Sequence, residues 1–333
     1  LGLDPVTYLV AVEELSWGDP VVGLQVSVQN GLVATAILER GSGEQRERWL
    51  PALASGDLLG AFALSEPRAG SDATALETRA ERADDGWVLT GRKKWVTNGD
   101  RADRIIVFAR TGEGRKAVGA FVVDRSADGY RVVARETTMG FRASETVEVE
   151  LDGVRVPGED VLGDPQGGFA CAMDALDAGR LGVAAVSLGI AQAALEHSIS
   201  YATEREQFDR PIADFGAIRE KLARMEIRIA QARALAHRVA EEYGEGAGAG
   251  NPGDGPGLRS LTARVGMAKT AASEAALWVA DEAVQIFGGY GYMRDYPVEK
   301  LLRDAKGTEI FEGTNEILRE LTARALLEEI SGG

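Results

Sequence analysis

The hydrophobic pattern of this sequence changes twice along the chain, and the order of the patterns is the strongest constraint on its fold. Residues 5–56 carry apolar side chains at helical spacing, as in PVTYLVAVEELSW. Residues 60–157 consist of β-rich runs that are separated by glycine and aspartate turns. After Pro157 the helical spacing returns and continues to the end. Because the short strands follow one another without helices between them, we expect an antiparallel barrel or sandwich in the middle.

These patterns predict an α+β chain of three domains. We expect an N-terminal helical domain over residues 1–58, a middle β domain over 59–158 and a C-terminal helical bundle over 159–333. Ser42 precedes the amphipathic run GEQRERWLPALAS and is its expected N-cap. The chain starts in helical register, so we expect the natural protein to begin earlier and the N-terminal domain to be partial here.

The C-terminal part has the spacing of a helical bundle. Between residues 211 and 243, apolar residues recur at alternating intervals of four and three, which is the period of a bundle seam. The seam consists of Ile218, Leu222, Met225, Ile229, Ala232, Ala236 and Val239. The glycine- and proline-rich segment 244–257 is expected to be a flexible loop. Two more helices are expected over residues 258–287 and 314–330.

Charge and cysteine content argue against several functions. With 52 acidic and 37 basic residues, the net charge is −15, which is unfavourable for general binding to nucleic acids or anionic membranes. Cys171 is the single cysteine, so no intrachain disulfide can form, and we predict a cytoplasmic location in which Cys171 packs rather than reacts. His197 and His237, expected at the surface, lie too far apart for a local ligand pair, and no metal site is predicted. No membrane span is predicted either.

The segment EIFEGTNEI places a carboxylate directly before a predicted helix. Thr314 is the expected N-cap of this helix, with Asn315 and Glu316 in its first turn. Glu312 stands beside Gly313, and a carboxylate on such a loop can project into a cavity without crowding from the backbone. The residues alone are more typical of an ordinary acidic start of a helix.

Three further segments have two interpretations each. The glycines of FGGYGYMRDYP (287–297) allow close approach to a phosphate or a flat ring, but the segment could also be a glycine-rich turn, and it is not a GxGxxG motif. ALSEPRAGSD (63–72) could be a polar loop that leads into the β domain. KWVTNG (94–99) could be the end of a strand, with Trp95 in the core.

Together, ALSEPRAGSD, KWVTNG and EIFEGTNEI resemble the acyl-CoA dehydrogenase family, and the resemblance covers nearly the whole chain in the same order. It implies a helical domain, a β domain and a four-helix bundle, with non-covalently bound FAD and a homotetrameric assembly. The implied reaction is α,β-dehydrogenation of a saturated acyl-CoA thioester to the trans-2-enoyl-CoA. The implied electron acceptor is an electron-transfer flavoprotein.

The resemblance also implies roles for individual residues. Glu312 matches the base that abstracts the α-proton while the β-hydrogen passes to the flavin as hydride. Some relatives place the base at the position of Gly179, which carries no carboxylate here, so Glu312 is preferred. Residues that match FAD-binding segments are Phe62, Leu64, Ser65, Ser71, Trp95, Val96, Thr97, Arg205, Phe208, Gln285, Ile286, Gly288, Gly289, Thr314, Asn315 and Glu316. Residues that match substrate-binding positions are Ser71, Asp177, Gly179, Arg180 and Gly313.

Three positions depart from the family pattern. Arg68 and Asp209 stand where glycine is usual, and Gly216 stands where glutamine is common and helps to bind FAD. Alternatives that stay open are a flavin-dependent oxidase of the same fold, a relative acting on a nitroalkane or a carrier-protein thioester, and a non-catalytic FAD-binding scaffold. The segment DAGR resembles the short-chain members, so a short or short-branched acyl group is expected, although sequence does not determine its length.

Overall fold

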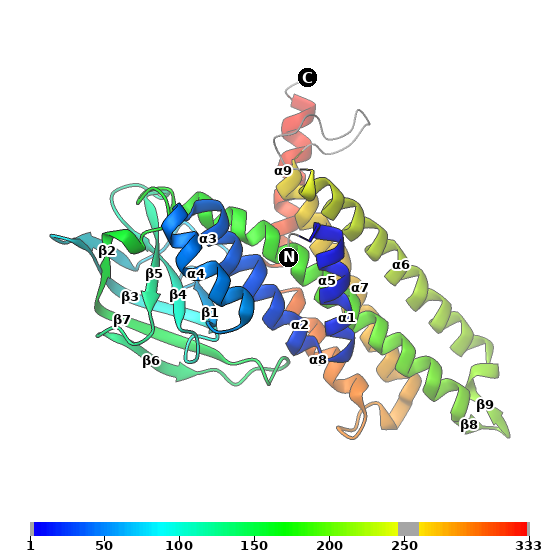
Figure 1. Cartoon of the computed structure of the whole chain (residues 1–333). Coiled ribbons are helices and arrows are strands. Elements are labelled where there is room, and N and C mark those ends of the chain that lie inside the picture. The colour runs from blue at the N-terminus through cyan, green and yellow to red at the C-terminus, as the bar shows by residue number, and fades with distance from the viewer. Residues whose placement is uncertain (1–2, 246–259, 332–333) are drawn as a thin grey trace. The chain divides into compact units, whose positions relative to one another are not determined.

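The computed structural model describes residues 3–245 and 260–331 (Figure 1). They form two compact units. One of them, called here the helical unit, consists of the described residues within Leu1–Leu24, Met139–Phe141 and Arg180–Gly333. The other, called here the sheet unit, comprises Gln25–Thr138 and Arg142–Gly179. From residue 246 on, the predicted loop 244–257 lies outside the described residues.

The predicted helical start of the chain is confirmed. Its helices are α1 (Pro5–Gly18), α2 (Pro20–Ser27), the π-helical η1 (Val28–Ala34), α3 (Thr35–Arg40) and α4 (Gly43–Ser55). Ser42 caps α4 as expected, because its side chain accepts a hydrogen bond from Gln45 N while the Gln45 side chain accepts one from Ser42 N. Gln45 Nε2 also donates to the carbonyls of Glu159 and Val161, which joins α4 to the chain that follows the sheet.

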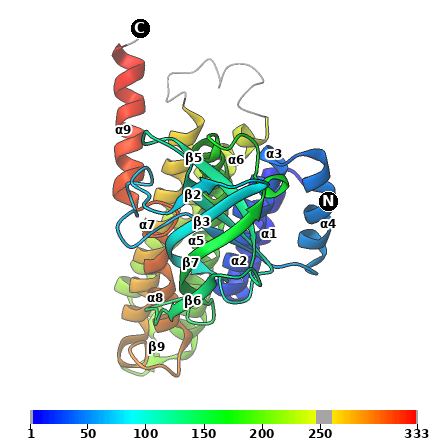
Figure 2. The same ribbon diagram turned by 90° about the vertical axis from the view of Figure 1, so that its left-hand side faces the viewer.

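The predicted strands form one curled sheet (Figure 2). Its strands are β1 (Gly60–Ala63), β2 (Arg79–Arg82), β3 (Gly86–Thr97), β4 (Arg104–Arg110), β5 (Val118–Asp124), β6 (Tyr130–Arg135) and β7 (Thr146–Pro157). They are ordered β1-β4-β2-β3-β7-β6, with β5 also paired to β4. Alternate apolar side chains of these strands, such as Leu89, Val107 and Val149, form the core of the unit.

The sheet is mixed rather than antiparallel throughout, which corrects the prediction. Strand β1 pairs with β4 in parallel, with Ala61 opposite Ile105. Parallel neighbours need a long connection, and here the chain forms β2 and β3 before it returns to the side of β1. No local pattern in GAFA reveals this pairing, because it depends on which strand the chain later places beside it.

The helical unit is built around α7. Its elements are α1, the later part of α5 (Gly168–Glu204), α6 (Gly216–Gly244), α7 (Leu261–Phe287), α8 (Pro297–Thr308) and α9 (Asn315–Ser331). Helix α7 packs against α6, α8 and α9, and α6 and α7 run side by side (Figure 1). The predicted seam of α6 is buried from Met225 to Val239, whereas Ile218 and Leu222 are half-buried.

Helix α8 is missing from the sequence prediction. Pro297 occupies its first turn and Val298 and Leu301 are buried, which is the usual arrangement for a helix that begins at proline. The signal is present in PVEKLLRDAKGT, but the helix is short and follows the glycine-rich FGGYGY segment directly. The coarse order of helices, sheet and helices is nevertheless confirmed.

Two helical stretches, Pro20–Arg40 and Gly168–Glu204, are long and apolar enough to span a membrane by length and composition alone. Most of each apolar window is buried inside the protein, as in core helices that need no lipid. Cys171 is buried as predicted, and His197 is exposed as predicted. His237 is instead half-buried with its Nε2 enclosed, because it lies on the inward side of α6.

Candidate active site

The loop between α8 and α9 carries the predicted base on a left-handed backbone. Glu312 has a φ angle of 55° and Gly313 one of 99°. Glycine adopts such an angle freely, whereas a glutamate does so only where its surroundings hold it. Thr314 then caps α9, since its Oγ1 accepts a hydrogen bond from Ile317 N at 3.4 Å. The N-cap prediction for Thr314 is confirmed.

Two buried cations hold successive carbonyl groups of this loop. Arg180, on α5, donates from Nε to the Glu312 carbonyl at 3.0 Å. Lys269, on α7, donates from Nζ to the Gly313 carbonyl at 3.0 Å and to Asn315 Oδ1 at 3.0 Å. Lys269 was not among the predicted site residues, because a single lysine in the apolar run VGMAKTAAS carries no local signal of its partners.

The environment of the Glu312 carboxyl group differs from that of a solvated glutamate. Its Oε2 is buried and has no hydrogen-bond partner among the described residues. Burial raises the pKa of Glu312 to about 7, although the positive charges of Arg180 and Lys269 act in the opposite direction. An ordinary acidic start of a helix would leave the carboxylate in water, so that interpretation does not fit.

The predicted flavin segment of the sheet unit ends β3 with a bulge. The register of β3 against β7 shifts between Lys93 and Val96, and Trp95 has a φ angle of 57°. Val96 is buried, but Trp95 is 53 % exposed, so the interpretation of Trp95 as a core residue is wrong. The bulge turns a large flat side chain outward at a cost in backbone strain, which is typical of a functional position.

The ALSEPRAGSD loop is fastened beside this bulge. Lys94 N donates to the Ser65 carbonyl at 2.9 Å, and a Cβ added to Gly70 would lie 4.0 Å from the Trp95 ring. Phe62 and Leu64 are half-buried on the same stretch, whereas Ser71 is exposed.

A buried ion pair that sequence reasoning missed anchors the ALSEPRAGSD loop. Lys93 Nζ lies 2.7 Å from Glu66 Oε1 and 2.9 Å from the Leu64 carbonyl. The Glu66 carboxylate also accepts the backbone N–H groups of Glu77 and Thr78. Burial alone would raise the pKa of Glu66, but Lys93 and these N–H groups together lower it. The pair therefore joins the first part of the loop, and the chain just before β2, to β3.

The predicted FAD-binding residues around Arg205 and Gln285 lie at the ends of α5 and α7. The Tyr201 and Phe287 rings stack with centroids 4.0 Å apart, and the Arg205 guanidinium lies 5.4 Å from the centre of the Tyr290 ring. Gln285 and Gly289 are exposed, whereas Ile286 is buried. Gly288 has a φ angle of 59° and ends α7.

The three departures from the family pattern have different structural settings. Asp209 has a φ angle of 60° beside the 87 % exposed Phe208, in the turn between β8 (Glu206–Gln207) and β9 (Arg210–Pro211). Gly216 begins α6 and has open space where a side chain would lie. The Arg68 side chain is exposed and pairs with Glu77 at 3.6 Å.

The remaining predicted residues lie on α5 and α9. Asp177 is half-buried, and Gly179 is buried so closely against η1 that a Cβ on Gly31 would lie 3.0 Å from its Cα. Glu316 is exposed, but Asn315 is buried and its side chain is engaged by Lys269.

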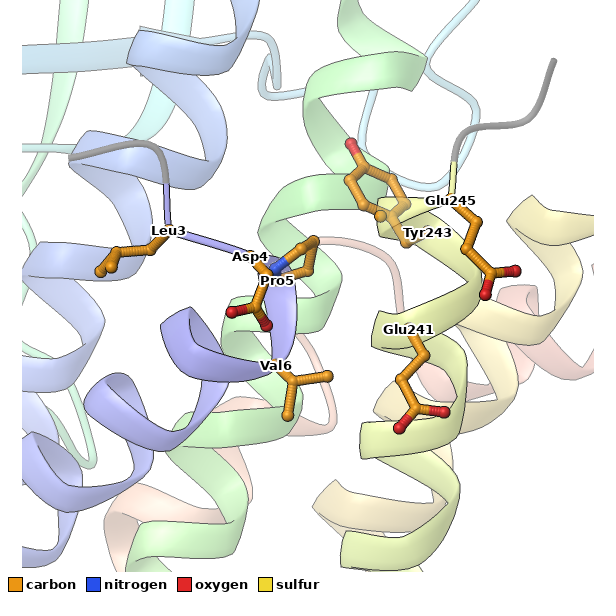
Figure 3. A pocket seen from close by; sticks show the side chains of 8 residues that line it. Leu3, Asp4, Pro5, Val6, Glu241, Tyr243 and Glu245 are labelled. Carbon is orange, nitrogen blue, oxygen red and sulfur yellow. The ribbon is translucent and has the colours of Figure 1, made fainter. Parts of the chain in front are cut away.

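A surface hollow of about 620 Å³ lies elsewhere, between the start of α1 and the end of α6 (Figure 3). Its charged groups are the carboxylates of Asp4, Glu241 and Glu245, which are unfavourable for a phosphorylated ligand. It contains none of the predicted site residues, so it is not the candidate active site.

Comparisons with known proteins match the whole length of this architecture. Residues 1–57, 61–154 and 166–327 match the N-terminal, middle and C-terminal domains of acyl-CoA dehydrogenase. An acyl-CoA dehydrogenase of Bacillus subtilis is 44 % identical over 328 residues, which are 98 % of this chain and 83 % of that protein.

Two solved structures agree. The butyryl-CoA dehydrogenase of Megasphaera elsdenii has a TM-score of 0.92 at 42 % identity, with 98 % of this chain and 83 % of that one covered. A structure described as the electron transferring flavoprotein of Acidaminococcus fermentans has a TM-score of 0.93 at 42 % identity, with the same coverage.

The fold is that of a flavin-dependent oxidoreductase. The chain belongs to the acyl-CoA dehydrogenase family. The predictions of FAD as cofactor and of FAD-dependent acyl-CoA dehydrogenation are confirmed.

Proposed function

We propose that this enzyme oxidises a short-chain saturated acyl-CoA to the trans-2-enoyl-CoA, with Glu312 as the base that removes the α-proton. The observation that carries the proposal is the buried Oε2 of Glu312, which has no partner within the described part of the chain. A carboxylate with a pKa of about 7 matches general-base work at neutral pH far better than a solvated one.

The backbone beside the base supports the same chemistry. The Glu312 N–H donates to no acceptor among the described residues, so it is free to donate to a thioester carbonyl. Such a hydrogen bond stabilises the negative charge that develops on the carbonyl oxygen as the α-proton moves to the Glu312 carboxylate. Arg180 and Lys269 keep this N–H and the carboxylate in one geometry by holding the two carbonyls that follow.

The chain's residues fit FAD at two places. The half-exposed Trp95 ring offers a flat apolar surface to the isoalloxazine, with Thr97 two residues further along β3. Gly288 and Gly289 leave open space at the end of α7, where a side chain would hinder close approach of the pyrophosphate. Bound FAD supplies the acceptor for the β-hydrogen, which leaves as hydride.

We further propose a short acyl group, an electron-transfer flavoprotein as acceptor and a homotetramer in the cytoplasm. The similarity to a butyryl-CoA dehydrogenase and to a structure described as an electron transferring flavoprotein supports the first two. The domain limits near residues 58 and 158 belong to the same proposal. An oxidase or a non-catalytic scaffold is not favoured.

Two reactions test the proposal separately. The first is anaerobic bleaching of the flavin band by saturated acyl-CoAs of increasing chain length, which measures the whole oxidation. The second is exchange of α-protons for deuterium in 3,3-dimethylbutanoyl-CoA, which has no β-hydrogen and therefore reports only on the base. Glu312→Gln is compared with Glu309→Gln, which changes a carboxylate three residues earlier that pairs with Lys306.

We expect the wild type and Glu309→Gln to catalyse both reactions, with butanoyl-CoA bleaching fastest among the chain lengths. Glu312→Gln should retain FAD and lose both reactions by about 10³-fold or more, since no other group takes the proton. Exchange at the wild-type rate in Glu312→Gln would show that the base lies elsewhere. Rapid recovery of the bleached flavin in air would favour the oxidase.

A further inference from the structure

Lys269 is a buried cation, and no carboxylate of residues 3–245 or 260–331 forms a hydrogen bond with it. Its side chain is fully buried, and it donates hydrogen bonds to the Gly313 carbonyl and to Asn315 Oδ1, each at 3.0 Å. Asn315 is held in turn by Ser273, whose Oγ lies 3.0 Å from Asn315 Nδ2. Removing an ammonium group from water without a paired anion is costly, so a lysine at this position requires a compensating role.

The loop that Lys269 contacts is the one that needs support. Glu312 adopts a left-handed backbone conformation that glutamate rarely occupies, and such strain persists only where neighbouring groups determine it. Arg180 holds the Glu312 carbonyl and Lys269 holds the next one along the chain. Lys269 also holds Asn315 in the first turn of α9, so it joins the strained turn to the helix that follows.

We propose that Lys269 is a positioning residue for the Glu312 base, which it serves by fixing the turn from Glu312 to Asn315 and by placing a positive charge beside the carboxylate. This inference rests on the proposed role of Glu312. It gives the lysine a purpose that packing alone does not, since a methionine of similar length would fill the same space without burying a charge.

The charges around the turn determine in which direction the pKa of Glu312 shifts when the charge of Lys269 is lost. Arg180 on α5 and Lys269 on α7 both favour the ionised form of Glu312. Glu309 and Glu316 also interact with Lys269, but Glu309 pairs with Lys306 and Glu316 is exposed. Loss of the lysine charge therefore leaves Glu312 with fewer cations and makes it harder to ionise, so a higher pH is needed for the same fraction of active base.

The test measures α-proton exchange in 3,3-dimethylbutanoyl-CoA as a function of pH. Lys269→Met removes the charge and the donors, whereas Lys269→Gln removes the charge but keeps a donor for the Gly313 carbonyl. Thr270→Val is the matched control, because Thr270 is the next residue of α7, is buried and has no partner for its hydroxyl among the described residues. Flavin absorbance and Tm establish that each variant is folded and holds FAD.

We expect Lys269→Met to exchange about 10²-fold more slowly than the wild type, as a displaced catalytic group does. The acidic limb of its profile should move to higher pH. The exchange rate of Lys269→Gln should fall less than that of Lys269→Met, but the acidic limb of its pH profile should move by the same amount. Thr270→Val should match the wild type in both respects.

Wild-type rates and an unmoved limb in folded Lys269→Met would overturn the inference. If that variant does not fold, an unmoved limb in Lys269→Gln overturns it equally. Glu312→Gln is measured in parallel: if it keeps its exchange activity, the assignment of the base has failed, whereas loss of exchange there with an unaffected Lys269→Met rejects the lysine role alone.

Discussion

Arg180 Nε lies 3.0 Å from the carbonyl oxygen of Glu312, although the two residues are 132 positions apart in the sequence. The contact attaches the loop of the proposed base to a long buried helix rather than to its own neighbours in the chain. Because the guanidinium plane holds its N–H groups in a rigid arrangement, the contact restrains the direction of the Glu312 carbonyl as well as its distance.

Replacement of this arginine by lysine should therefore be harmful even though the charge is kept. A lysine ammonium is a point charge on a flexible chain and cannot reproduce the Nε–H donor. We expect Arg180→Lys to lower the rate of acyl-CoA oxidation by about 10²-fold with FAD still bound. Stopped-flow bleaching of the flavin measures this. Arg324→Lys, at an exposed position of α9, is the control, and its rate of flavin bleaching should equal that of the wild type. Equal rates in Arg180→Lys and Arg324→Lys would contradict the role of Arg180.

The activity should depend on pH through Glu312. Burial raises the pKa of this carboxyl to about 7, so the folded protein holds the proton where a solvated glutamate has already lost it. Because the base must be ionised, the rate of α-proton exchange should rise about tenfold per pH unit below 7 and become constant above 7. Exchange rates measured from pH 5 to pH 9 test this, and flavin absorbance shows at each pH whether the protein still holds FAD. If the exchange rate became constant above about pH 4.5 instead, the base would be a solvated carboxylate.

The Glu66–Lys93 pair should matter for stability. Both side chains are buried with Nζ and Oε1 2.7 Å apart, so Lys93→Met leaves the buried Glu66 carboxylate without a cation. We expect the free energy of unfolding to fall by about 3–5 kcal/mol, and Glu66→Gln in the same chain to restore part of it. Urea unfolding of the two single variants and the double variant gives the coupling. Arg68→Ala, which breaks the exposed pair with Glu77, should cost less than about 1 kcal/mol.

Asp209 explains why a family glycine can be replaced at the turn between β8 and β9. Its φ angle of 60° is one that aspartate tolerates and a β-branched residue does not. We expect Asp209→Val to lower the free energy of unfolding by about 1–2 kcal/mol and Asp209→Gly to lower it little or not at all. Thermal melting of the FAD-free protein measures both. Equal losses in the two variants would mean that the aspartate side chain, rather than the backbone angle, stabilises the turn.

Features set by neighbouring residues could be predicted from the sequence, and those set by distant residues could not. The Ser42 cap, the Thr314 cap and the buried face of α6 follow from spacings of three or four residues, and each was found. Glu312 was found through the family motif, since the helix-start pattern alone is shared with many ordinary helices.

The partners of the proposed base were harder to predict. Lys269 is 44 residues from Gly313 in the chain, and its sequence neighbours are alanines and threonine that show nothing of its hydrogen bonds. The parallel pairing of β1 with β4 could not be predicted for the same reason, because it depends on the route of the chain through β2 and β3. Helix α8, by contrast, has a local signal in its starting proline and could be predicted from the sequence.

Trp95 offers a way to separate a functional tryptophan from a structural one in the same unit. Trp95 is 53 % exposed at a strained bulge, whereas Trp49 is 1 % exposed in the packed interior. Without flavin, Trp95→Ala should cost less than about 1.5 kcal/mol of unfolding free energy, because about half of the ring is already in water and the strained residue becomes smaller. Trp49→Ala should cost about 3–5 kcal/mol through the cavity it leaves.

Trp95→Ala, the less destabilising of the two variants, should have the larger effect on the retention of FAD. Loss of the Trp95 ring removes the flat apolar surface that we propose for the isoalloxazine, so Trp95→Ala should release FAD at least about tenfold faster. Trp49→Ala, measured at a temperature at which it remains folded, should release FAD at the wild-type rate. Flavin fluorescence after dilution reports the release. A Trp95→Ala protein that keeps its FAD as tightly as the wild type would remove Trp95 from the flavin site and leave the bulge without a known purpose.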